Sequence, residues 1–76
     1  MKPTFAQHND FLAHRRIIGV AFEHDDYVHI TAGEHKGKKG SLVSVEELGE
    51  DPVYLVELEA GSDALVRQSA IERHDF

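Results

Sequence analysis

Three short segments of this chain place apolar side chains at every second position, and glycine or proline residues lie between them. The alternating segments are residues 27–31, 42–45 and 53–59, and the breaks that follow them are residues 32–40, 49–52 and 60–63. A period of two is typical of strands that bury one face, and glycine and proline favour the turns that join such strands. Strands that recur about every ten residues indicate a mainly β fold, either a small antiparallel barrel or a curled meander.

The inward positions of these segments predict the core. It comprises Val28, Ile30, Val43, Val45, Val56 and Leu58, and Phe5, Phe11 and Phe22 are also expected to be buried. A further strand is expected at residues 17–22, where β-branched and aromatic residues cluster, and another at residues 64–67. Residues 69–72 are expected to form a single helical or 3₁₀ turn.

Thr4 is a suitable N-cap for one short helix within residues 4–14, where Phe5, His8 and Leu12 have helical spacing. We therefore divide the chain into an N-terminal extension or short helix, residues 1–16, and the barrel itself, residues 17–76.

The small size of the chain and its lack of cysteine restrict its chemistry. A chain of 76 residues buries only about 60% of its unfolded surface, which leaves little room for a deep substrate cavity. Without cysteine there is no disulfide, no thiolate nucleophile and no thiolate ligand for zinc. The longest apolar stretch, residues 17–22, is far shorter than the ~20 residues of a membrane span, and no signal-peptide pattern is present. We expect a cytoplasmic domain.

Basic residues are concentrated in one predicted turn, although the net charge of the chain is −6 at pH 7. Residues 31–40 hold three lysines and one glutamate, whereas residues 41–66 hold seven acidic residues and no basic one. Nucleic-acid affinity comes mainly from cations that neutralise phosphates, and an acidic chain repels a phosphate backbone at long range. The charge balance therefore favours a protein partner over RNA or a ribonucleoprotein.

The basic turn and its flanking strands resemble the KOW motif, which is found in ribosomal large-subunit proteins and in the C-terminal domain of the transcription elongation factor NusG. Val28 and Ile30 match the first strand of that motif, and Val43 and Val45 match the second. The glycines Gly33, Gly37 and Gly40 and the lysine Lys36 match the connecting loop. The resemblance implies an SH3-like antiparallel barrel and a non-enzymatic module that binds a macromolecule through this loop.

The residues expected to contact a partner are the side chains of this loop and two tyrosines beside it. They are His35, Lys36, Lys38 and Lys39, with Tyr27 or Tyr54 as a stacking surface. Glycine permits positive φ and a close approach of the backbone, so Gly33, Gly37 and Gly40 are expected to shape the loop. A simpler interpretation stays open, in which the loop is a solvated hairpin whose lysines protect the sheet edge.

Catalytic and metal-binding patterns are lacking in the sequence. No serine lies in a nucleophile-elbow context, and the six histidines form neither an HxH nor an HxxxH pair. We therefore predict no enzyme activity, no metal and no cofactor. An alternative function is a small acidic inhibitor, of the immunity or antitoxin kind, that covers a basic partner with residues 46–59. Its contact residues would be Glu46, Glu47, Glu50, Asp51, Glu57 and Glu59.

Overall fold

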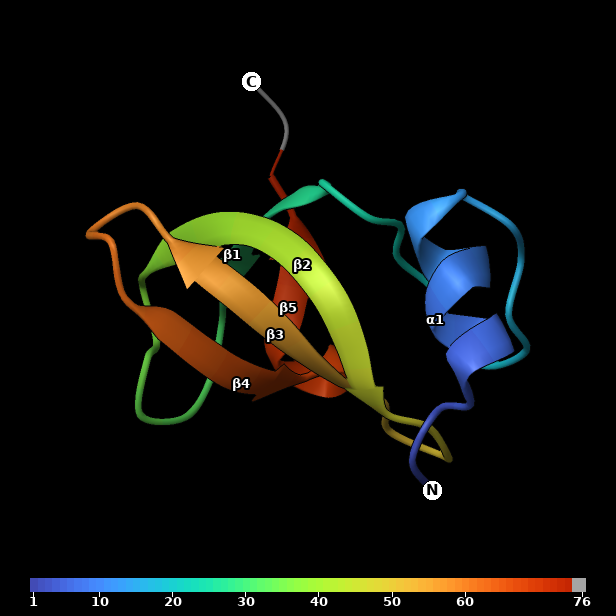
Figure 1. Cartoon of the computed structure of the whole chain (residues 1–76). Coiled ribbons are helices and arrows are strands. Elements are labelled where there is room, and N and C mark those ends of the chain that lie inside the picture. Colours follow the sequence, from blue (N-terminus) through green and yellow to red (C-terminus); the bar gives the residue numbers. More distant parts are fainter. Residues whose placement is uncertain (75–76) are drawn as a thin grey trace.

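The computed structural model describes residues 1–74, and in this part of the chain one helix precedes five strands (Figure 1). The elements are α1 (Phe5–Leu12), β1 (Tyr27–Ile30), β2 (Lys39–Glu47), β3 (Val53–Leu58), β4 (Asp63–Arg67), the 3₁₀ turn η1 (Gln68–Ala70) and β5 (Ile71–Arg73). All pairings are antiparallel, in the order β4-β3-β2-β1-β5. The predicted mainly β class with a short N-terminal helix is confirmed. The sheet is curved but not closed, which is compatible with a small barrel-like fold.

The predicted alternation places one face of each strand in the core. Val28 and Ile30 of β1 are buried, as are Tyr54, Val56 and Leu58 of β3. Residues 64–67 lie in β4, where Ala64 and Val66 are buried, and the predicted turn near residue 69 is present as η1. No helix within residues 1–74 combines the length and the apolar character needed to cross a membrane.

Two β-bulges in β2 change which of its side chains face the core. Leu42 pairs with Val56 but Ser44 pairs with Leu55, so Val43 is an extra residue, and a second shift follows Val45. An extra residue bends a strand and resets its alternation. Leu42 and Val45 therefore both point inward, and Val43 is only half-buried. The prediction of Val43 as a core residue is wrong for this reason, and the core position next to it belongs to Leu42.

Helix α1 begins directly after Thr4, which is its N-cap as predicted. The Thr4 hydroxyl accepts a hydrogen bond from the Gln7 backbone N–H at 3.2 Å, and the Gln7 side chain accepts one from the Thr4 N–H at 2.8 Å. This is a capping box. Phe11 is the buried residue of the helix, with its ring 6.2 Å from that of Tyr54, whereas Phe5 is 82% exposed. The expected burial of Phe5 is wrong, because the helix contacts the sheet along the Phe11 side.

Residues 17–22 do not form the predicted strand. The Val20 N–H donates to the Ile17 carbonyl at 3.1 Å across a turn in which Gly19 has φ +85°. This turn leaves Ile18 97% exposed, while Phe22 packs beside Tyr54 with ring centroids 5.9 Å apart. The apolar residues of this segment thus cover the core as irregular chain, and the first strand begins at Tyr27. The division of the chain at residue 16 stays a prediction.

Candidate functional site

The lysine loop, residues 33–40, is held in one conformation by backbone hydrogen bonds. Gly37 N–H donates to the Ile30 carbonyl and Ile30 N–H to the Lys38 carbonyl, both at 2.8 Å. Two turns lie inside this closure, since the Lys36 N–H bonds to Gly33 and the Lys38 N–H to His35. Gly33 and Gly37 have φ of +87° and +91°, a region that side chains disfavour. The loop is therefore a fixed platform for its side chains.

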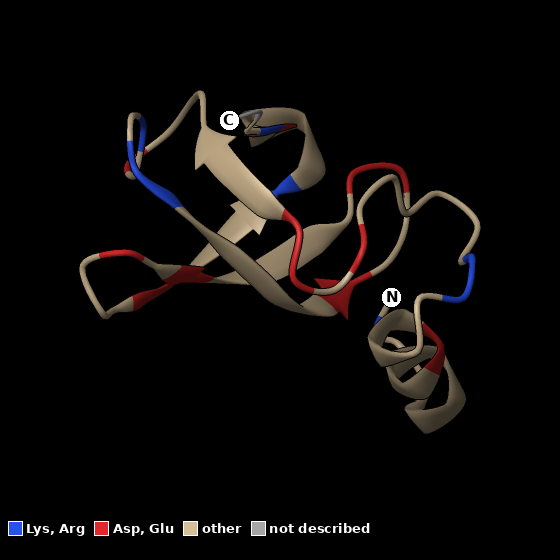
Figure 2. Ribbon diagram, turned by 90° about the horizontal axis from the view of Figure 1, so that it is seen from above, with Lys and Arg blue, Asp and Glu red and all other residues tan. Residues whose placement is uncertain are grey.

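Its three lysines face solvent. Lys36, Lys38 and Lys39 are exposed, and none forms a salt bridge within residues 1–74. In Figure 2 they form the basic segment at the tip of one hairpin. Their positive charge is available to a partner.

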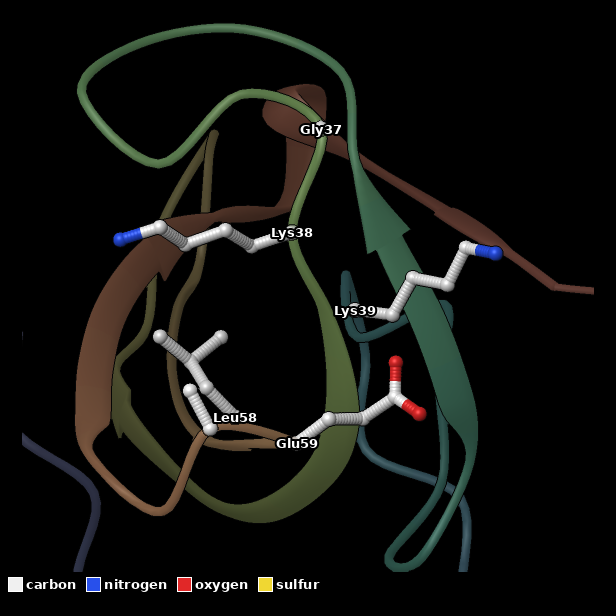
Figure 3. A pocket seen from close by; sticks show the side chains of 6 residues that line it. Gly37, Lys38, Lys39, Leu58 and Glu59 are labelled. Atoms are coloured by element: carbon white, nitrogen blue, oxygen red, sulfur yellow. The ribbon is translucent and has the colours of Figure 1, made fainter.

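Lys38 and Lys39 flank a shallow groove of about 360 Å³ between the lysine loop and the β3–β4 turn (Figure 3). Leu58, Glu59 and Ala60 form the other wall. The two lysines point to opposite sides, Lys38 on the side of Leu58 and Lys39 on the side of Glu59. The groove thus combines a small apolar surface with two ammonium groups and one carboxylate.

Gly40 allows the two walls of this groove to approach one another. It is buried in β2 opposite Leu58, and a Cβ at this position would lie 2.2 Å from the Glu57 carbonyl oxygen. Its φ is not positive, so it differs from Gly33 and Gly37 in its role. The backbone of β3 occupies the space that any side chain would need.

Tyr27 lies beside the groove on the outer face of β1. The Glu59 carboxylate accepts a hydrogen bond from its hydroxyl and so raises the pKa of Tyr27, with smaller contributions from burial and from the Glu59 charge. The Tyr27 ring contacts the His74 ring edge-on at 5.4 Å. His29, opposite Lys39, lies 3.2 Å from the Glu72 carboxylate through Nε2. This half-buried aromatic and histidine surface adjoins Glu59 and Lys39 of the groove.

Tyr54 and His35 lie elsewhere. Tyr54 is fully buried beneath α1 and residues 17–22, so it presents no stacking surface to a partner. His35 is half-buried and lines a separate depression, together with residues of β4 and η1. The structure brings Lys38, Lys39 and Tyr27 together and separates Tyr54 and His35 from them. Lys36 lies in the same loop but does not line the groove.

The acidic residues of the alternative function are dispersed over the molecule (Figure 2). Glu47 pairs with the Met1 amino group and with Lys2, and Asp51 accepts two hydrogen bonds from Ser69. Glu46 accepts from the Ser44 hydroxyl. Glu47 pairs with Val53 of β3, and Glu57 lies four residues further along the same strand. At the rise of a strand, Val53 and Glu57 are roughly 13 Å apart. Glu57 is thus separated from Glu47 along the sheet.

The wall formed by Leu58, Glu59 and Ala60 was not predicted as part of the lysine-loop site, although Glu59 was named as a contact residue of the alternative function. Its position follows from the β2–β3 register, which pairs Gly40 with Leu58. Counting back from the pair Glu47–Val53 without bulges would pair Gly40 with Ala60, and the two bulges shift the pairing by two residues to Leu58. Leu58 was assigned to the core, where it is buried, and it also lines this wall of the groove.

Taken together, the fold and this surface define a small antiparallel β domain with a basic loop and an adjoining groove. Among residues 1–74, no group of three or more histidine, aspartate or glutamate side chains is arranged to hold a metal ion. Comparison of the chain with protein-family models, with curated proteins and with solved structures gives no match.

Proposed function

We propose that this chain is a non-enzymatic binding module, of KOW type and SH3-like barrel architecture, whose lysine loop binds an acidic segment of a protein. The observation that carries the proposal is the set of three exposed lysines, unpaired within the described residues, on a loop fixed by glycines. Preorganised cations bind carboxylates with less loss of entropy than mobile ones do. The strand–loop–strand arrangement around Gly33 and Gly37 supports the KOW resemblance.

The groove supports a protein partner over RNA. The exposed Ala60 offers apolar contact for a side chain over the buried Leu58, while Lys38 and Lys39 can pair with carboxylates on either side of it. The rest of the molecule carries an acidic excess, which weakens attraction of a phosphate backbone at long range. A peptide that combines acidic and aliphatic residues satisfies both features.

The test is capture from native lysate with the immobilised protein, with and without nuclease treatment. The triple variant Lys36→Gln, Lys38→Gln, Lys39→Gln should keep the melting temperature, since exposed substitutions change stability by about 0.5 kcal/mol or less. It should nevertheless lose the captured protein. The matched control is Lys2→Gln, Arg15→Gln, Arg16→Gln, which removes the same charge away from the groove and should retain it.

Two results would contradict the proposal. Equal capture by the lysine-loop variant and the wild type would leave the loop as a solvated hairpin. Nuclease-sensitive capture would reassign the partner to RNA. With the captured protein identified, amide chemical-shift changes on titration should centre on residues 37–39 and 58–60.

A further inference from the structure

Strand β4 forms one edge of the sheet and carries a self-complementary row of exposed side chains. Asp63, Leu65 and Arg67 point outward, while the intervening Ala64 and Val66 are buried. Leu65 is 63% exposed, an unusual exposure for a leucine in the middle of a strand. The outward row therefore reads acidic, apolar, basic, with the apolar residue at its centre.

The backbone of the same three residues faces the open edge. In the β3–β4 ladder, Leu58 N–H donates to the Ser62 carbonyl and Gln68 N–H to the Pro52 carbonyl. These bonds flank the pairs Glu57–Asp63 and Val53–Arg67, which makes both of them non-hydrogen-bonded pairs. By alternation, Ala64 and Val66 bond to β3, and the N–H and C=O groups of Asp63, Leu65 and Arg67 point away from it.

We propose that two copies of this chain associate through their β4 strands, which pair antiparallel about a two-fold axis at Leu65. In that register the Leu65 residues of the two protomers lie opposite each other, and each Asp63 lies opposite the Arg67 of the other protomer. Such an interface is isologous, so both ion pairs form at once. The outward N–H and C=O groups then pair across the axis, and the two sheets become one continuous sheet.

The charges within one protomer favour this arrangement. Asp63 lies directly opposite Glu57 in the β3–β4 pair, and like charges in that position destabilise a sheet. Neither Asp63 nor Arg67 forms a salt bridge within residues 1–74. A second copy gives Asp63 an opposite charge on its free side and gives Arg67 a carboxylate.

The edge is also accessible. A depression of about 390 Å³ lies alongside Leu65, Val66 and Arg67, and residues 32–35 form its far wall. Charged side chains commonly protect edge strands of monomers. In β4 the charged residues Asp63 and Arg67 lie at the two ends of the strand, and the centre of the edge is a leucine. Five residues per protomer form a small interface, so we expect weak, concentration-dependent association.

The test is sedimentation velocity of the full chain from roughly 10 µM to 1 mM, a range that covers the dissociation constants of weak interfaces. The wild type should shift from monomer to dimer. Asp63→Arg alone and Arg67→Asp alone should each lower the association constant at least about tenfold, since each places like charges opposite one another twice. The double variant Asp63→Arg, Arg67→Asp should restore association, because it exchanges the two charges.

Amide hydrogen exchange distinguishes association through the β4 edge from association through any other surface. Protection of the Leu65 N–H should rise with protein concentration, while the Ala64 and Val66 amides should be protected at every concentration by their bonds to β3. Dilute-solution melts verify that each variant is folded. A wild type that stays monomeric at 1 mM, a dimer unaffected by both single reversals, or a charge exchange that fails to restore association in a folded protein would overturn the proposal.

Discussion

Gln68 joins three parts of the chain through a single side chain. Its carboxamide oxygen accepts hydrogen bonds from the Tyr54 hydroxyl at 2.5 Å and from the Ala21 N–H at 2.9 Å. Its own backbone N–H donates to the Pro52 carbonyl at 2.7 Å. The hydroxyl of a fully buried tyrosine thereby has a partner, as buried polar groups require. This residue connects η1, β3 and the irregular segment 17–22.

Replacing Tyr54 by phenylalanine should therefore change the stability of the protein and its dependence on alkaline pH. Near neutral pH, loss of the hydroxyl should cost about 0.5–1.5 kcal/mol. Burial raises the pKa of Tyr54 from 10.0 to about 12. As pH rises, the tyrosine hydroxyl therefore loses its proton at a lower pH in the unfolded chain than in the folded protein. The contribution of this hydroxyl to the free energy of unfolding is fully present below pH 10 and declines as pH rises toward 12. Urea unfolding from pH 7 to 11.5 should show a steeper alkaline decline in the wild type than in Tyr54→Phe. Parallel declines would contradict this assignment.

At the level of elements, the sequence predicts the strands and turns better than it predicts irregular chain. Alternation identified β1 and β3, because each buries one face without interruption, and the short strand expected at residues 64–67 is present as β4. The bulges of β2 were missed, because a bulge depends on the pairing with β3 and leaves no mark in the composition of one strand. Residues 17–22 have strand-like composition, yet tertiary packing and the Gly19 turn override that propensity.

The candidate site shows the same division between local and long-range information. The lysines and glycines of the loop are adjacent in sequence, so their clustering could be predicted. The opposing wall of Leu58, Glu59 and Ala60 comes from another hairpin, and its place depends on the register of β2 against β3. Tyr54 was named as a possible stacking surface, although its alternation places it on the buried face of β3 with Val56 and Leu58. The sequence does not show that α1 and residues 17–22 cover that end of the core.

The close packing of β2 against β3 at Gly40 allows a further prediction. Gly40→Ala should destabilise the protein by about 3 kcal/mol or more, because the added Cβ overlaps the β3 backbone at the Glu57 carbonyl. Gly37→Ala meets no atom within 4 Å and should cost only about 1–2 kcal/mol, from its positive φ. Chemical denaturation of the two variants measures the difference. Equal destabilisation would show that β2 and β3 can separate at this point without cost.

For the whole molecule, the connections around η1 span the side of the sheet that the strands leave open. β4 and β5 are the two ends of the strand order, and η1 lies between them in the chain. Gln68 bonds to Pro52, Thr31 N–H to the Ala70 carbonyl, and Ser69 to Asp51. The short 3₁₀ turn is thus attached both to the β2–β3 turn and to the end of β1, and it replaces the missing β4–β5 ladder.

This attachment should make the fold sensitive to acid through Asp51. The Ser69 hydroxyl and N–H donate to its carboxylate at 2.7 and 2.9 Å and hold the pKa of Asp51 below its ordinary value of 3.8, with a smaller contribution from Arg67. A carboxyl group with a lowered pKa stabilises the fold above its unfolded pKa, and that stability is lost as pH falls through the folded value. Asp51→Asn should therefore melt earlier than the wild type at pH 6, with the difference shrinking below pH 4. Thermal melts from pH 6 to 2.5 measure this, and Glu50→Gln, one residue away and exposed, is the matched control. A gap between wild type and Asp51→Asn that stays constant over this range would mean that the Asp51 carboxylate charge does not hold η1 to the β2–β3 turn.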